Sequence, residues 1–508
     1  MKRLFIAALS LALLLASLTI EAKKKVKEPE VPQMMNYPSA EIDKNLLHGG
    51  DVVIQGRLVI PEEAKGEKIP QDVLDKINGR FTVIMRDYLV NKEKTSVIEF
   101  KPDGTFSMNL HVPYPKFVLL YPLADVYACP GDTVDVTIDT TKPTREEGII
   151  IGGTGVSGEV SKLTYKIGMT FFPPQQSLDI QNQDSLMKWK DEQVEKLDNL
   201  VRNMNEGLPE LEGCSPLASD ILRTYILWRR LYNICHEYDL FVDGNDSIDR
   251  EAFWQQYFSF VTPREKYLLD NQLLMIAGDD FFFNRMEFTL MRPFNPHFMS
   301  THEIWEKNKE LLQDKLHLSP TNFSWQVCRL RDIFTVLKWY KTDFDAAAED
   351  IAQALPSITH PELIRRAVLT YRDYVKENEI KVVEDKPMTK GDSIFQRIIE
   401  PYKGNVLYVD FWEMSCGPCR ATMLHMRDQV EAHKDKPIKY LYITDDTPEH
   451  CKSFLEPNNI KGEHIHITRS EWGYLQERFQ FTGIPFILLF DKQGKLRKDA
   501  TVEQLLNE

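Results

Sequence analysis

The sequence predicts a multidomain α+β protein: an N-terminal β-sandwich, a central α-helical domain and a C-terminal α/β domain. Three observations predict it. Short runs rich in Val, Ile, Thr and Phe come first, apolar residues spaced by three and four follow, and strand and helix patterns then alternate to the end. We place the domains at residues 45–154, 155–380 and 392–508, with a charged, proline-containing linker at 381–391.

Length and charge narrow the classes of function. The chain has 508 residues, enough for three domains, and 43% of them are hydrophobic. This balance excludes a disordered chain and a disulfide-stapled mini-protein. The net charge of −14 argues against a nucleic-acid-binding protein, which would carry a basic patch or stripe.

Residues 1–22 predict a cleaved signal peptide. Lys2 and Arg3 precede an uncharged run over residues 4–20, and Ala22 is a small residue at a plausible cleavage point. The run is shorter than the roughly 20 residues that cross a bilayer, and no cysteine is placed for a lipid anchor. We therefore expect an exported, soluble periplasmic protein that is not a lipoprotein and has no stable membrane span after cleavage. The alternative is an uncleaved anchor helix.

The first domain is expected to be built from short strands. Turn signals at residues 102–104 and 130–132 separate the runs, and this spacing is typical of a small β-sandwich. The expected strands are Asp51–Ile60, Arg80–Arg86, Thr95–Lys101, Thr105–Val112, Phe117–Tyr121 and Thr133–Asp139.

The second domain is expected to be helical. Two apolar stripes step by three and four, and both are expected to be buried; they are Ile221, Tyr225, Trp228, Tyr232, Cys235 and Ile364, Val368, Tyr371, Val375. Cys235 and Cys328 are interpreted as small core residues. The aromatic run at residues 281–283 could line a binding groove, but core packing is favoured.

Strand and helix patterns alternate in the third domain, which predicts an α/β layer with parallel strand pairs. The expected strands are Asn405–Phe411, Ile438–Thr444, His464–Thr468, Phe486–Asp491 and Leu496–Ala500. Helices are expected from Pro418 to about Val430, from about Pro448, near Glu471–Phe479 and over Val502–Leu506.

Cys416-Gly417-Pro418-Cys419 follows the first of these strands and contains the only close pair among seven cysteines. Pro418 favours a helix start. There, unpaired N–H groups and the positive end of the helix dipole stabilise a thiolate. Cys416 is the expected nucleophile, and Cys419 would attack the resulting mixed disulfide.

The alternative for this motif is half of a zinc site. Its further ligands would be sought among His450, Cys451, His464 and His466. Export and the isolation of Cys451 favour redox use. We therefore expect no metal and no cofactor.

These residues resemble a known family. Val409-Asp410-Phe411-Trp412 and the dithiol through Arg420 resemble the active-site strand and helix of the thioredoxin fold. Gly483-Ile484-Pro485-Phe486 is similar to its cis-proline loop. Residues 390–392, with 394–395 and 402–404, resemble the lead-in of the exported TlpA/ResA-like branch. The resemblance covers about residues 389–508. Residues 117–120 and 130–134 carry a weaker likeness to a domain of unknown function that precedes such modules.

The resemblance implies roles for individual residues. Asp410 would be a buried acid that takes the proton of Cys419; a plain polar strand residue is the alternative. Pro485 would be cis and face the dithiol, leaving the Ile484 backbone to pair with substrate. The other expected substrate-binding residues are Trp412, Gly417 and Pro418, although Trp412 could serve core packing alone.

Three positions depart from the family pattern. Ser415 replaces the usual Trp before the first cysteine, and Leu424 replaces a kinking proline. Thr422 replaces a Glu found in cytochrome-maturation members, which weakens a dedicated role in apocytochrome reduction.

The motif and the resemblance together predict a periplasmic thiol-disulfide oxidoreductase that reduces disulfides in protein substrates, with electrons expected from a membrane thiol-transfer protein. An oxidase or isomerase using the same cysteines is one alternative. A thiol peroxidase is disfavoured because Glu413 stands where that chemistry wants Thr or Ser. Outside enzymes, the alternative is a binding protein with a structural or sensing disulfide.

Overall fold

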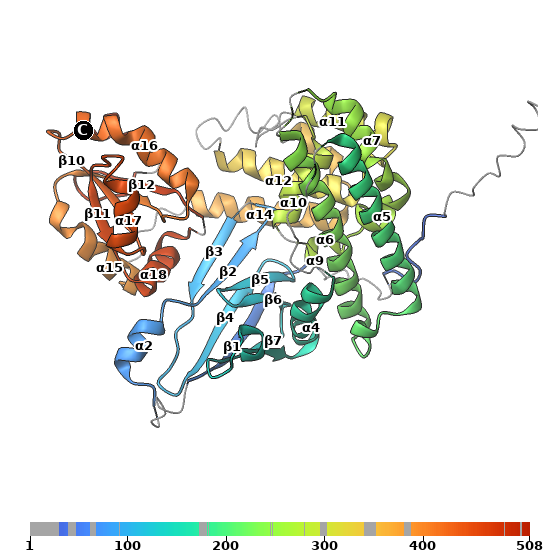
Figure 1. Cartoon of the computed structure of the whole chain (residues 1–508), viewed down its shortest axis with the longest axis horizontal. Coiled ribbons are helices and arrows are strands. Elements are labelled where there is room, and N and C mark those ends of the chain that lie inside the picture. The colour runs from blue at the N-terminus through green and yellow to red at the C-terminus, as the bar shows by residue number, and fades with distance from the viewer. Residues whose placement is uncertain are drawn as a thin grey trace, which may run out of the picture.

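The computed structural model describes residues 30–38, 47–60, 68–90, 92–171, 180, 182–243, 245, 247–278, 280–294, 302–339, 352–379, 388–481, 483–497 and 500–508. The expected signal peptide and most of the expected linker lie outside these residues. Figure 1 shows the C-terminal domain (orange to red) at the left, the helical region (green to yellow) at the right, and the N-terminal strands (blue to teal) below and between them.

The N-terminal strands form two four-stranded sheets with the orders β4-β1-β7-β8 and β3-β2-β5-β6. β1 runs parallel to β7, and the other pairs are antiparallel. Val52 and Ile54 of the first sheet share a buried core with Val83 and Val118 of the second. The strands are β1 Gly50–Val59, β2 Thr82–Asp87, β3 Lys92–Val97, β4 Thr105–Val112, β5 Lys116–Tyr121, β6 Ala124–Ala128, β7 Thr133–Asp139 and β8 Ile149–Gly153.

The strand predictions hold for β1, β2, β4, β5 and β7 within two residues. The strand expected at Thr95–Lys101 instead begins at Lys92 and ends at Val97, before the turn that packs Phe100 into the core. β6 and β8 were not predicted, since short runs with Ala and Gly carry little β signal. Short helices α2 Gln71–Ile77 and α3 Arg145–Gly148 complete this region.

The helical region follows. Its helices are α4 Gly155–Phe171, α5 Gln183–Glu206, α6 Pro216–Asp243, α7 Arg250–Phe258, α8 Glu265–Leu268, α9 Leu274–Ala277, α10 Asp280–Met286, α11 His302–Leu316, α12 Phe323–Trp339 and α14 Pro361–Glu379. Phe282 and Phe283 are core residues, as favoured, and Cys235 and Cys328 are buried as predicted. Among the described helices, none combines the length and apolarity needed to cross a bilayer.

One predicted stripe in this region is wrong. Ile364 and Val368 of α14 are exposed, whereas Leu363 and Ala367 are buried. The first turns of the helix are therefore rotated by one residue from the prediction, because Leu363 and Ala367 are also four residues apart and the spacing alone does not choose between the two faces. The side chains of Tyr371 and Val375 lie outside those that the structure describes. On α6 the prediction holds for Ile221, Trp228 and Cys235, which are buried.

The C-terminal domain is a four-stranded sheet of order β11-β10-β9-β12 between two helical layers. β9, β10 and β11 are parallel, and β12 is antiparallel to β9. Helices α16, α17 and α19 contribute to the core on one face, and α15 and α18 to the core on the other. The elements are α15 Lys390–Ile399, β9 Val406–Phe411, α16 Gly417–Ala432, β10 Ile438–Thr444, α17 Pro448–Leu455, β11 Glu463–His466, α18 Arg469–Phe479, β12 Phe486–Phe490 and α19 Val502–Asn507.

Two details differ from the sequence prediction here. The segment expected to form a second hairpin strand at Leu496–Ala500 makes only an isolated bridge between Leu496 and Phe490. α15 begins at Lys390, inside the expected linker, because Thr389 and Asp392 cap its first turn reciprocally.

The C-terminal domain packs against the N-terminal region through α18. Gln480 accepts a hydrogen bond from the Thr95 amide at 2.9 Å, and Glu477 accepts one from Val97 at 2.8 Å, along β3. At the other end of the contact the two backbones meet: a Cβ at Gly473 would collide with the carbonyl oxygen of Gly79. Only glycine permits this approach, so the two regions are held in one register.

Candidate active site

The dithiol motif lies where β9 ends and α16 begins. Strand β9 is buried along its whole length, and the loop after it leads to Cys416, which caps the helix. Gly417 and Pro418 are the first helical residues and are exposed. The backbone nitrogen at this position makes no hydrogen bond within the helix, so Pro418 can begin the helix without removing one.

Cys416 and Cys419 are joined by a disulfide, with their Cα atoms 5.3 Å apart. Cys419 is fully buried, whereas Cys416 is partly exposed. The Cys419 amide donates to the Cys416 sulfur at 3.1 Å. Because this amide points out of the first turn of α16, it would stabilise negative charge on that sulfur. The geometry makes Cys416 the accessible member and Cys419 the internal member of the pair.

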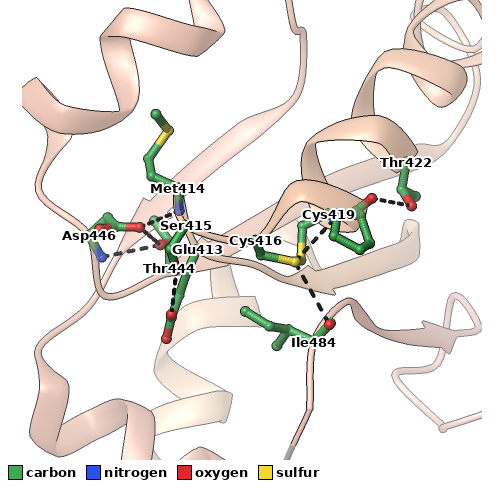
Figure 2. Close-up of a disulfide and its surroundings, with 10 residues drawn as sticks. Glu413, Met414, Ser415, Cys416, Cys419, Thr422, Thr444, Asp446 and Ile484 are labelled. Carbon is green, nitrogen blue, oxygen red and sulfur yellow. Dashed lines mark hydrogen bonds between the residues drawn. A yellow bond between two sulfur atoms is a disulfide. The ribbon is translucent and has the colours of Figure 1, made fainter. Parts of the chain in front are cut away.

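The loop before β12 faces this pair. The Ile484–Pro485 peptide bond is cis, as the resemblance implied. The carbonyl oxygen of Ile484 lies 3.8 Å from the Cys416 sulfur, and Figure 2 shows Ile484 directly below the disulfide. A backbone carbonyl next to the accessible sulfur is placed to accept a hydrogen bond from an extended chain bound across the site.

Asp410 lies inside the domain, on β9. Its side chain is fully buried, and neither carboxylate oxygen has a hydrogen-bond partner within the described residues. Burial raises its pKa to about 7. A carboxyl group with this pKa can exchange a proton near neutral pH, and it lies on the same face of the sheet as the core that holds Cys419.

The neighbours of Asp410 across the sheet are polar. Tyr442 on β10 is opposite Asp410, and His464 on β11 is opposite Tyr442. The two rings stack with centroids 5.2 Å apart. Sequence reasoning placed His464 only in the zinc alternative and missed Tyr442. The period-2 alternation of three parallel strands could have found the row, since it places these residues on one face.

The burial of Trp412 contradicts one prediction. It was expected to contact substrate, but its side chain is fully buried and packs 6.3 Å from Phe454, centroid to centroid. Trp412 follows Asp410 by two residues and therefore points into the same core, away from the surface. The alternative, core packing, fits the structure.

The loop leading to Cys416 is held by Asp446, which sequence reasoning did not identify. Asp446, after β10, accepts a hydrogen bond from the Met414 amide at 2.6 Å (Figure 2). His450 contacts the other oxygen of Asp446 at 3.0 Å. The Cys416 amide donates to the Glu413 carbonyl at 3.0 Å, which closes a tight turn before the motif. Ser415, at the family's usual Trp position, is exposed.

No group of three or more metal-ligating side chains is arranged to hold an ion in the parts of the chain that the structure describes. Two candidate zinc ligands have different surroundings: Cys451 is buried in α17, whereas His450 is exposed and bound to Asp446. The five remaining cysteines, Cys129, Cys214, Cys235, Cys328 and Cys451, are free thiols.

Comparison with known proteins agrees with this geometry. Residues 390–505 match the model of the AhpC/TSA family. A segment of 134 residues is 22% identical to the thiol-disulfide oxidoreductase ResA of Bacillus thuringiensis, covering 26% of this chain and 76% of that protein. A thioredoxin from Alicyclobacillus acidocaldarius is 37% identical over 67 residues, which are 13% of this chain and 62% of that one.

Among solved structures, the thioredoxin domain of a thiol-disulfide oxidoreductase from Bacteroides vulgatus is 25% identical, with a TM-score of 0.20. The match covers 22% of this chain and 79% of that one. Residues 390–505 are thus similar to thioredoxin-like proteins of the TlpA/ResA type, and these similarities indicate a thiol-disulfide oxidoreductase.

Proposed function

We propose that this protein is exported to the periplasm and reduces disulfide bonds in protein substrates through Cys416 and Cys419. The observation that carries the proposal is the asymmetry of the pair. Cys416 is partly exposed at the start of α16, whereas Cys419 is fully buried on the Asp410 side of the sheet. One cysteine is thereby suited to attack from outside and the other to release the product.

The reaction runs in two exchanges. The Cys416 thiolate attacks one sulfur of the substrate disulfide, the substrate S–S bond breaks, and the released thiolate takes a proton from water. Cys419 then gives its proton to the Asp410 carboxylate and attacks the Cys416 sulfur, and the second substrate thiolate leaves and is protonated. The substrate gains two electrons and two protons, and the dithiol becomes a disulfide.

The surroundings support these roles. A carboxyl group with a pKa near 7 is half ionised at neutral pH, so Asp410 can accept a proton and return it. An extended segment of substrate would lie across Gly417 and Pro418, which are exposed, and pair with the backbone at Ile484, beside Pro485. Trp412 has no part in this surface because it is buried.

Each turnover leaves the pair oxidised, so the proposed direction needs a dithiol donor. In an exported protein this donor would be a membrane thiol-transfer protein. The Gly-Pro dipeptide between the cysteines supports the reducing direction, because it resembles that of strongly reducing thioredoxins. The thiol peroxidase alternative is not favoured: Glu413, three residues before Cys416, is bound to Ser415 and Arg469.

The test is disulfide exchange by the reduced full chain with dithiobis(nitrobenzoate), an aromatic disulfide whose released thiol is coloured. The unsubstituted chain should release two thiols rapidly. Cys419→Ser should release one and keep the other as a mixed disulfide, and Cys416→Ser should lose the rapid phase. Cys129→Ser and Cys214→Ser are matched controls, since both remove a half-buried thiol outside the motif. Equal rapid phases in the Cys416→Ser and unsubstituted chains would overturn the proposal.

The proposed electron donor can be tested by trapping mixed disulfides. The Cys419→Ser variant, held in the exporting organism, should accumulate mixed disulfides through Cys416 with substrates and with one membrane protein. Recovery of no membrane protein would count against the proposed electron source while leaving the exchange chemistry intact.

A further inference from the structure

Arg469 is an arginine at an unfavourable end of a helix. It is the first residue of α18, where the positive end of the helix dipole repels a cation. Two carboxylates compensate for this: Asp445 lies 2.8 Å from the guanidinium and Glu413 lies 3.4 Å from it. Asp445 follows β10, and Glu413 belongs to the loop between β9 and Cys416. The arginine thus joins three loops at the same edge of the parallel sheet.

The loop that Arg469 holds leads directly into the dithiol. The Glu413 side chain also accepts from the Ser415 hydroxyl at 3.4 Å, and the Glu413 carbonyl accepts from the Cys416 amide at 3.0 Å. Glu413 therefore has a fixed position in the turn that leads into the nucleophile, three residues before it. Without a cation nearby, its charge would disfavour the Cys416 thiolate.

The other face of Arg469 is covered by the N-terminal region. The guanidinium lies 5.3 Å from the ring centroid of Tyr121, at the end of β5, in the geometry of a cation–π contact. This contact spans two domains, and the close backbone approach of Gly79 and Gly473 holds them in place. The side chain of Ser470, next to Arg469, donates to the carbonyl of Asn78 in the same interface.

We propose that Arg469 is a positioning residue that keeps Cys416 reactive, and that the N-terminal domain, through Tyr121, is part of the redox site because it holds this arginine over Glu413. The inference rests on the proposed function and deepens it. It assigns the N-terminal domain a role in the reactivity of the dithiol, so the C-terminal domain alone is not the complete site.

The effect is electrostatic. Arg469 compensates the charges of Glu413 and Asp445, and this lowers the free energy of the Cys416 thiolate relative to its thiol. Removal of the guanidinium leaves two carboxylates beside the loop. The thiol then keeps its proton to higher pH, and less of the attacking species is present. Burial alone would lower the pKa of Arg469, but hydrogen bonding to Asp445 and the charges of Asp445 and Glu413 raise it, so the guanidinium is charged throughout the working range.

The experiment measures the pH dependence of iodoacetamide alkylation at the Cys416 peptide, by mass spectrometry on the reduced full chain. Arg469→Gln should reduce the alkylation rate at pH 6 about threefold to tenfold and shift its midpoint to higher pH, the scale of one charge–charge interaction at a half-exposed site. Glu413→Gln should shift the midpoint the other way, by less, since Asp445 remains.

Tyr121 tests the part played by the N-terminal domain. Tyr121→Ala should give a shift in the direction of Arg469→Gln, and Tyr121→Phe should give none, because the contact uses the ring. Glu99→Gln is the matched control: Glu99 pairs across the same interface with Lys390 at 2.7 Å, away from the dithiol. It should leave the profile unchanged.

Other titratable groups near Cys416 stay in place in every variant. They are Asp410 on β9, Arg420 on α16, and Asp446 with His450 beyond β10. An unchanged midpoint in both Arg469→Gln and Glu413→Gln would overturn the proposal, and so would equal shifts in Tyr121→Ala and Glu99→Gln. Failure of the unsubstituted chain to exchange disulfides would instead overturn the proposed function, so the two failures are distinguishable.

Discussion

Two regions of this protein bury a carboxylate with the same acidity and use it differently. Asp410 in the C-terminal domain and Asp332 on α12 of the helical region both have a pKa raised to about 7, mainly by burial. One oxygen of Asp332 accepts from the Trp305 indole at 2.7 Å and from Arg329 at 3.3 Å. Neither oxygen of Asp410 has such a partner in the described residues.

The difference shows what a shifted pKa means for function. At Asp332 the carboxylate organises buried donors, and its high pKa is a by-product of burial beside Glu287. At Asp410 the carboxylate organises nothing, yet it lies in the core that holds the dithiol. A buried carboxyl group without a hydrogen-bond partner in the described residues, on the sheet face that packs against the dithiol helix, is better explained by chemistry than by folding.

The most direct test of this comparison removes each carboxylate in a separate variant. Asp332→Ala should destabilise the helical region by about 3–5 kcal/mol, because it removes an acceptor shared by the Trp305 indole N–H and the fully buried Arg329. Hydrogen–deuterium exchange, resolved by peptide, would report it as loss of protection over α11 and α12. Unchanged protection would show that Asp332 is no more structural than Asp410.

The matched variant, Asp410→Ala, should change the stability in the opposite direction. In the folded chain Asp410 keeps its proton up to about pH 7, whereas in the unfolded chain it loses it near pH 4. The carboxyl therefore costs stability progressively from about pH 4 to pH 7. Three pKa units correspond to roughly 4 kcal/mol, so the variant should be more stable than the unsubstituted chain by up to about that amount at pH 8, and the gain should vanish at pH 4. A pH-independent difference would contradict this account.

The same variant should be slower in chemistry. Without the carboxylate, Cys419 loses the base proposed to take its proton, and the second exchange should slow by about 10²-fold or more at pH 7. Stopped-flow decay of the mixed disulfide at Cys416 measures this step. The first exchange, which does not use Asp410, serves as the internal control.

The smallest effect on stability is expected at the interface between the N-terminal and C-terminal domains. Glu99 accepts from Lys390 at 2.7 Å and from the Tyr474 hydroxyl at 2.8 Å, and about half of its side chain is exposed. Glu99→Gln should cost less than about 1 kcal/mol, and the loss should disappear in high salt. Urea unfolding at two salt concentrations checks this. A larger, salt-independent loss would mean that the interface depends on this pair rather than on backbone packing.

The sequence predicted the site where its signal is local. The four-residue motif, the strand before it and Ile484-Pro485 lie in short segments with their own patterns, and the structure brings them together. Arg469 and Tyr121 could not be found this way, since 347 intervening residues separate them and only tertiary packing joins them. Trp412 and the α14 stripe went wrong because a pattern shows that a residue is apolar, but not which neighbour covers it.

The reduction potential of the Cys416–Cys419 pair in the full chain tests the central claim most directly. Equilibration with a dithiol buffer, followed by mass spectrometry of the two cysteines, would give it. A reductase predicts a value near about −270 mV, like thioredoxin. A value near about −120 mV, like that of the oxidant DsbA, would contradict the account and reverse the direction of electron flow.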